Sequence, residues 1–142
     1  MTTTAVRARP VPLHPLHALM LAGRLPLFLG ALLSDITYYN SYQIQWSNFA
    51  SWLIAGALVF CGFALLCALI GLTRPERRQG PALIYLLVLV ATWILGFINA
   101  LVHARDAWAV MPTGLVLSVI VMLMILVATW LGFSTLRTGA VQ

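Results

Sequence analysis

The chain has 142 residues, of which 62% are hydrophobic and 8% charged, and its net charge is +5. Ordinary soluble domains carry about a quarter charged residues, so this composition excludes a typical water-soluble domain. The eight basic residues are all arginines, and all but Arg24 lie between apolar stretches or at their ends, a distribution typical of membrane topology. We therefore expect no nucleic-acid partner.

Four apolar stretches are each long enough to cross a hydrocarbon core, which requires about 20 residues. The sequence therefore predicts an all-α, polytopic membrane protein, a four-transmembrane-helix bundle embedded in the lipid bilayer. The expected domain covers residues 17–137, between a flexible cytoplasmic tail at 1–16 and a short C-terminal tail at 138–142. Its spans are expected at about 17–39, 48–72, 82–103 and 113–136.

The first predicted span contains two charged residues, Arg24 and Asp35. They are eleven residues apart, about 16 Å along a helix, so they cannot pair within it. A long arginine side chain can extend its charge to the membrane interface, and we expect this of Arg24. Asp35 requires a partner from another helix or contact with water.

Residues 38–52 combine polar side chains with several aromatic rings and are predicted to form a loop at the membrane surface. The following span carries small residues at four-residue spacing, for example Ala64 and Ala68, which allow close helix packing. This packing is expected within the chain, with a homo-oligomer interface as the alternative. Cys61 and Cys67 are expected to be core residues, because six helical positions place them on different faces.

The distribution of arginines predicts the orientation, because cytoplasmic loops are enriched in them. The turn at 73–81 is arginine-rich, which places it and both termini in the cytoplasm. The predicted location is a bacterial cytoplasmic (inner) membrane, with the chain N-in and C-in. Six arginines fall on the cytoplasmic side and one, Arg105, on the exterior: the six are Arg7, Arg9, Arg74, Arg77, Arg78 and Arg137.

A polar cluster is predicted at the exterior end of the third span. Asn99, His103 and Asp106 follow one another at spacings of four and three, so a continuing helix would place them on one face. A carboxylate beside a histidine can orient its ring or hold its proton. Together with Asp35 and Arg105, these residues are the candidates for ligand binding or proton handling, with a structural role in closing the bundle as the alternative.

Asp35 is expected to approach His103, Arg105 or Asp106, since both helix ends face the exterior. We predict that it pairs with Arg105, the one arginine on that side, because an unpaired carboxylate at the membrane edge is costly. One histidine and two carboxylates are few ligands for a metal ion, so no metal site is predicted. No catalytic residues are predicted, because no nucleophile–base set or phosphate-binding loop is present in the sequence.

A haem is often held in membrane cytochromes by paired histidines. His17 and His103 lie at opposite ends of their spans and cannot be axial ligands of one haem. His14 and His17 are expected to belong to a surface tail, since Pro15 separates them. No cofactor is therefore predicted; haem b bound by His103 alone, or shared with a second chain, remains as the alternative.

Three segments carry a resemblance to a known family: PLHALMLAGRLPLFLGALLSDITY, YQIQWSNFASWLIAGALVF and NALVHARDAWAVMPTGLVLS. Together the sequence is similar to the bacterial membrane-protein family catalogued as domain of unknown function 2231. The resemblance implies a four-helix membrane protein and an association with small redox subunits near periplasmic dehydrogenases. It also implies histidines two residues before the first-helix proline and near the start of the third helix, where this chain has Arg24 and the segment 81–85.

The predicted function is that of a non-enzymatic membrane subunit or scaffold for a partner protein, alone or within a larger membrane complex. The alternative is a redox-associated subunit that binds haem b or a quinone and passes electrons from a periplasmic dehydrogenase. The polar cluster around His103 is the candidate site in both cases.

Overall fold

The computed structural model describes residues 15–73 and 80–138 of the chain. Most of the predicted N-terminal tail, the six central residues of the arginine-rich turn and nearly all of the C-terminal tail lie outside this range, and so does His14. The described part is helical throughout apart from short connections. Its elements are α1 (Pro15–Ser41), α2 (Ile44–Leu72), α3 (Gly80–His103), the 3₁₀ turn η2 (Ala107–Ala109) and α4 (Thr113–Thr138).

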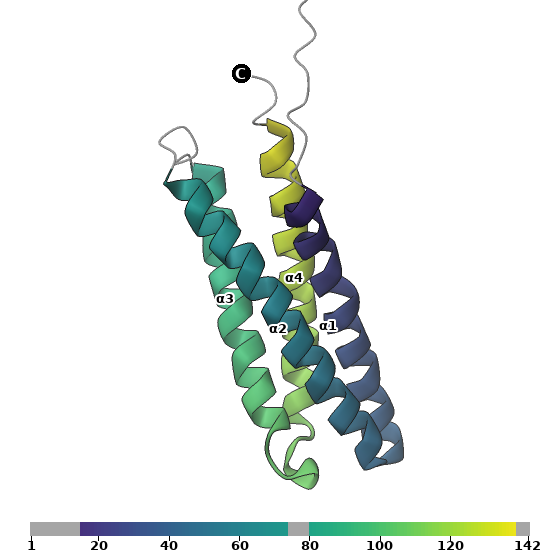
Figure 1. The fold of residues 1–142 in the computed structure, drawn as a ribbon. Helices are drawn as coiled ribbons and strands as arrows, with labels where there is room; N and C mark the ends of the chain where they lie inside the picture. The colour runs from purple at the N-terminus through teal and green to yellow at the C-terminus, as the bar shows by residue number, and fades with distance from the viewer. Residues whose placement is uncertain (1–14, 74–79, 139–142) are drawn as a thin grey trace, which may run out of the picture.

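The four long helices form an antiparallel bundle in which each helix packs against the next and α4 packs back against α1 (Figure 1). The start of α1 and the end of α4 lie at one end of the bundle, called here the proximal end. The α1–α2 turn and the α3–α4 connection lie at the opposite, distal end. The order of the helices around the bundle therefore follows their order in the sequence.

Three of the four helices are long and apolar enough to cross a membrane. They are the spans Ile44–Leu72, Ala82–His103 and Thr113–Ser134, so the chain is an all-α membrane protein with at least these three candidates. Among the described residues α1 does not meet this criterion, so the expected fourth span is not confirmed.

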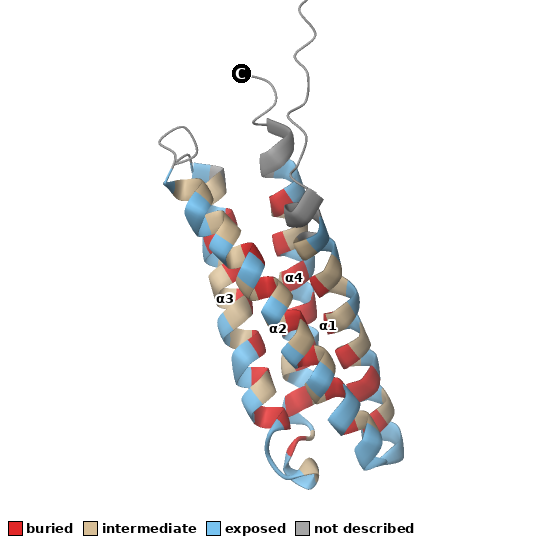
Figure 2. Ribbon diagram, in the orientation of Figure 1, coloured by how far each residue is buried: buried red, intermediate tan, exposed pale blue. Residues whose placement is uncertain are grey.

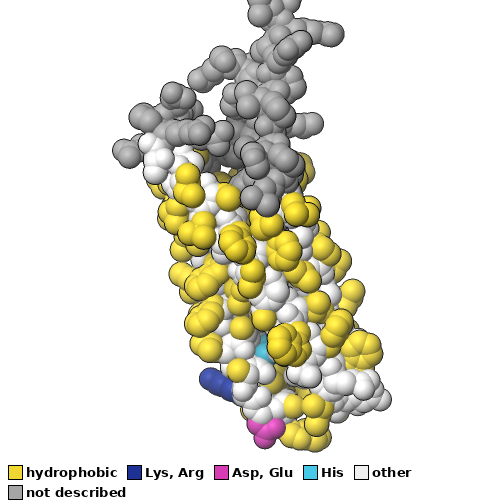
Figure 3. All heavy atoms as spheres, in the orientation of Figure 1, with side chains coloured by type: hydrophobic (Ala, Val, Ile, Leu, Met, Phe, Trp, Pro, Cys, Tyr) yellow, Lys and Arg dark blue, Asp and Glu magenta, His cyan; other side chains and the backbone are white. Residues whose placement is uncertain are grey.

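The core fills the space between the helices, and the outer surface of the bundle is apolar as well (Figures 2 and 3). Large apolar side chains point outward along the helices; Leu66, Leu87 and Leu123 are each more than half exposed. Figure 3 shows the charged side chains of this face only at the distal end. An apolar exterior over the middle of the helices suits a hydrocarbon solvent.

The connection between α1 and α2 differs from the loop predicted at 38–52. It consists of two residues, because α1 continues to Ser41 and α2 begins at Ile44. Tyr42 adopts a left-handed conformation (φ 53°) that ends α1, and its N–H donates to the carbonyl of Tyr38. The polar and aromatic residues of this region therefore belong to helix ends.

Several small residues of α2 pack inside the bundle, but only Ala64 of the expected pair Ala64 and Ala68 is fully buried. Ala50, Ala57, Cys61 and Ala64 have no exposed surface, while Cys67 is half-buried and both thiols are free. A homo-oligomer interface on the remaining surface of α2 stays a prediction.

Candidate functional site

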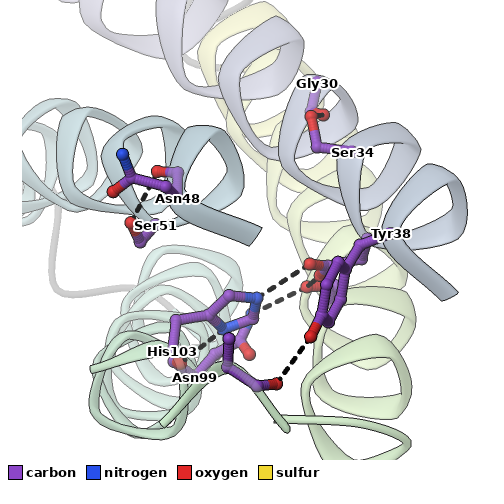
Figure 4. A network of polar contacts seen from close by, with 10 residues as sticks. Gly30, Ser34, Tyr38, Asn48, Ser51, Asn99 and His103 are labelled. Carbon is purple, nitrogen blue, oxygen red and sulfur yellow. Dashed lines mark hydrogen bonds and ion pairs between the residues drawn. The ribbon is translucent and has the colours of Figure 1, made fainter. Parts of the chain in front are cut away.

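The centre of the polar cluster is the carboxylate of Asp35, which α1 places inside the bundle about two turns from the distal end. Its Oδ1 lies 2.8 Å from Nε2 of His103, at the last residue of α3. Its Oδ2 accepts a hydrogen bond from the hydroxyl of Ser118 on α4. Figure 4 shows the ring of His103 directed towards these contacts from its own helix. One carboxylate thus joins three helices.

The contacts close into a ring through Asn99, one turn before His103 on α3. The side-chain amide of Asn99 donates to the hydroxyl of Ser118 at 2.9 Å. Nδ1 of His103 lies 2.9 Å from the backbone carbonyl of Asn99. We call these four residues, Asp35, Asn99, His103 and Ser118, the polar ring. Asn99 is hydrogen-bonded to Ser118, Ser118 to Asp35, Asp35 to His103, and His103 back to Asn99, so the contacts form a closed ring.

The positions of the protons follow from these partners. A backbone carbonyl can only accept, so Nδ1 of His103 must carry a hydrogen. The single hydroxyl hydrogen of Ser118 is used on Asp35. One further proton therefore lies between Nε2 and Oδ1, either as an imidazolium facing a carboxylate or as a neutral pair. Both arrangements have zero net charge, which limits the cost of burial in a low dielectric.

The polar ring is closed off from solvent. Asp35 has no exposed surface, and Asn99, Ser118 and His103 are 1%, 4% and 7% exposed. Chemically, such an arrangement can hold a proton and can fasten helices together. Both nitrogens of the imidazole and both oxygens of the carboxylate already have partners within the protein.

Two of the predicted cluster residues lie outside the polar ring. The helix α3 ends at His103, so the face that Asn99 and His103 share does not continue to Asp106. Arg105 and Asp106 are both exposed in the connection that follows. The predicted proximity of Asp35 to His103 is confirmed, whereas the predicted pair between Asp35 and Arg105 is wrong, because His103 and Ser118 occupy the carboxylate.

Two residues of α4 that the sequence analysis did not single out complete the site. Ser118 is a lone hydroxyl within an apolar run, which is a weak signal for a buried partner. Gly114 allows the imidazole to approach α4: a Cβ at this position would lie 2.9 Å from Cε1 of His103 and 2.7 Å from Cγ1 of Val110. The face of α4 that carries Gly114 therefore lies against the ring of His103.

The α3–α4 connection is attached to α1 by a second contact. The hydroxyl of Tyr38 donates to the backbone carbonyl of Ala107 in η2 at 2.9 Å. Beyond it, the ring of Tyr42 stacks on Trp108 with centroids 6.2 Å apart. The distal end is thus held by one buried and one exposed aromatic contact, close to the polar ring.

A second polar group lies nearer the proximal end. Arg24 of α1 has no exposed surface, so the expectation that it reaches the membrane interface is wrong. Its guanidinium interacts with the thiol of Cys61 on α2 and the hydroxyl of Tyr85 on α3. Neither contact has hydrogen-bond geometry, and all three guanidinium nitrogens are buried without a hydrogen-bond partner among the described residues.

Within residues 15–73 and 80–138, no group of three or more His, Cys, Asp or Glu side chains could hold a metal ion. The two positions to which the family resemblance drew attention, Arg24 and the segment 81–85, do meet in the fold, through Tyr85.

No curated protein and no solved structure gives a significant match to the sequence. The sequence does match one protein family, the predicted membrane proteins with domain of unknown function 2231 (DUF2231). The match covers residues 13–141, which is nearly the whole chain. With its apolar helical bundle, the chain belongs to this family of predicted membrane proteins.

Proposed function

We propose that the protein is a non-enzymatic subunit of the bacterial cytoplasmic membrane, with four spans and an exterior surface for a partner protein. The observation that carries this proposal is the closed polar ring, which joins α1, α3 and α4 and leaves no nitrogen of His103 and no oxygen of Asp35 without a partner. Oδ1 of Asn99 is buried and has no hydrogen-bond partner among the described residues. Such a ring fastens a bundle instead of offering open groups to a substrate. Recognition is then left to the exposed surface.

The fourth span in this proposal is α1. Its two charged side chains, Arg24 and Asp35, point into the bundle and have no exposed surface. Among the described residues, the exposed side chains between positions 19 and 36 are apolar, with Leu33 at 54% and Ile36 at 41%. The described exposed polar side chains of this helix lie at its distal end, at Asn40 and Ser41. A helix with this distribution can face lipid on its outer side although its overall sequence is less apolar than that of the other three.

The orientation follows from the arginine bias, with the proximal end in the cytoplasm and the distal end outside. Single cysteines at Thr3, Gln43 and Gln79, in a chain that carries Cys61→Ala and Cys67→Ala, test both parts of the topology. A membrane-impermeant maleimide added to intact cells should label position 43 and leave positions 3 and 79 unlabelled until the cells are opened.

The label at position 3 distinguishes four spans from three. If α1 lay on the outer surface, the N-terminus would be outside and position 3 would react in intact cells. Labelling of position 79 from outside would instead show that the orientation is reversed.

The exterior surface that we assign to the partner surrounds η2. Arg105, Asp106 and Trp108 are exposed there, and Trp108 is 70% exposed. Tryptophan and arginine are enriched at the centres of protein interfaces. Because they belong to a connection held by Tyr38, these side chains are presented in a fixed geometry.

The subunit role can be tested on tagged protein extracted from native membranes with a lipid-retaining polymer. We expect an assembly that contains a second protein in fixed stoichiometry and that dissociates in Trp108→Ala. The matched control is Trp130→Ala, since Trp130 is 78% exposed on α4, outside the distal connection. Particles that contain only this chain, or that lose the second protein equally in both variants, would contradict the proposal.

A further inference from the structure

The guanidinium of Arg24 is the starting point, because it is a permanent charge in an unusual place. Arginine cannot lose its proton in a protein, so burial cannot be relieved by neutralisation. Burial of an ion without a compensating charge is strongly unfavourable. The complete burial of Arg24 and the absence of a hydrogen-bond partner among the described residues therefore call for a source of negative charge.

The described carboxylates do not supply this charge. Both oxygens of Asp35 are used, by His103 and Ser118, and this residue lies about 16 Å further along α1. Asp106 is exposed at the distal end. The third acidic residue, Glu76, lies outside the described residues. Among the described residues no free carboxylate is left for Arg24, so a bound ion is the candidate for its counter-charge.

The neighbours of Arg24 are hydrogen-bond donors. The hydroxyl of Tyr85 is buried and, like the guanidinium nitrogens, has no hydrogen-bond partner among the described residues. The thiol of Cys61, which has no exposed surface, can donate as well. Because both residues interact electrostatically with Arg24, three helices bring N–H, O–H and S–H groups near one another in the core. Such donors suit an anion.

The packing around these groups limits the size of the anion. On the α1 side, a Cβ at Gly23 would lie 2.8 Å from the ring of Phe60, and on the α4 side a Cβ at Gly132 would lie 3.1 Å from the ring of Tyr85. The helices are therefore close together beside these groups, and a single-atom ion is the anion that needs the least space between them.

We propose that Arg24, Tyr85 and Cys61 form a binding site for one halide ion, with chloride as the physiological candidate. The ion neutralises the guanidinium and accepts hydrogen bonds from all three side chains. It links α1, α2 and α3 in the proximal half, as the polar ring links α1, α3 and α4 in the distal half. This site is independent of the partner surface proposed above.

Binding can be measured on the purified full-length chain in detergent, with gluconate replacing the halide at constant ionic strength. Equilibrium dialysis with radioactive chloride should give one ion per chain. The unfolding temperature should rise with chloride or bromide along a saturating curve, by on the order of 5 °C once the ion is far above its dissociation constant.

Three variants make the test specific. Arg24→Met keeps the aliphatic stem and removes the charge, so both the bound ion and the saturable stabilisation should disappear. Tyr85→Phe should weaken binding about tenfold through the loss of one hydrogen bond to a charged group. The control Arg105→Met removes an exposed arginine and should bind as the unmodified protein does.

Halide binding that persists in Arg24→Met, or a rise in unfolding temperature shared by Arg24→Met, would overturn the proposal, and so would saturable stabilisation by sulfate in place of halide. If Arg24→Met does not fold, Tyr85→Phe decides the matter, because an unchanged affinity for chloride in that variant contradicts the site.

Discussion

Nε2 of His103 lies 2.8 Å from Oδ1 of Asp35, a residue 68 positions earlier in the chain. The contact brings the end of α3 to α1, and the second oxygen of the same carboxylate holds α4 through Ser118. Because the pair is buried and shares one proton, removal of either partner leaves the other unsatisfied in a low dielectric.

The first prediction concerns this pair. Asp35→Ala and His103→Ala should each lower the free energy of unfolding in detergent by about 3–5 kcal/mol. The double variant should lose less unfolding free energy than the two single variants together, which gives a coupling energy of about 0.5–3 kcal/mol in a double-mutant cycle. Strict additivity of the two losses would contradict a direct interaction.

Arg105→Ala and Asp106→Ala provide the controls for this cycle, since both side chains are exposed. Each should change the free energy of unfolding by no more than about 0.5 kcal/mol. A large loss of stability in Arg105→Ala would instead support the pair between Asp35 and Arg105 that the sequence predicts.

The sequence predicts the helices well and the distal turn poorly, for a physical reason. The lengths of apolar runs set helix extents, so the expected limits fall within about four residues of those observed. The polar and aromatic side chains of the region 38–52 predict a loop. At a membrane surface such side chains also occupy helix ends, and Tyr38 is buried within α1.

The polar ring is predictable only in part. Asn99 and His103 can be placed together because residues four apart share a helix face. The end of α3 at His103, which removes Asp106 from that face, has no strong sequence signal. The contribution of Ser118 depends on the rotation of α4 about its axis, which long-range packing decides.

The second prediction concerns Gly114. Gly114→Ala should lower the free energy of unfolding by about 1–3 kcal/mol, because the new Cβ would press on Val110 and His103. The matched control is Gly56→Ala, whose Cβ would meet Leu27 at an ordinary 3.7 Å. There the higher helix propensity of alanine should leave stability unchanged or slightly raised. Equal effects of the two substitutions would indicate that α4 does not lie close to the imidazole.

The third prediction tests the attachment of the α3–α4 connection. Tyr38→Phe removes the hydrogen bond to the carbonyl of Ala107 and should cost about 0.5–1.5 kcal/mol of stability. Tyr39→Phe is the neighbouring control, because Tyr39 is 47% exposed. Amide hydrogen exchange should also become faster in η2 for Tyr38→Phe alone. Identical exchange in both variants would show that Tyr38 does not hold the connection.

The last prediction separates the subunit proposal from the haem alternative. An axial histidine must offer a free ring nitrogen to the iron, and in His103 one nitrogen faces the carbonyl of Asn99 and the other faces Asp35. Iron binding at His103 would therefore require the polar ring to open. The carboxylate of Asp35 and its bond to Ser118 would then have to rearrange, at the cost expected for a broken buried pair.

We expect protein purified from cells supplied with a haem precursor to show no Soret absorbance. Asp35→Asn, which weakens the hold on Nε2, is the informative comparison: it should remain colourless as well if no haem site exists. A stoichiometric Soret band that is lost in His103→Ala would contradict the expectation and favour the redox-associated subunit.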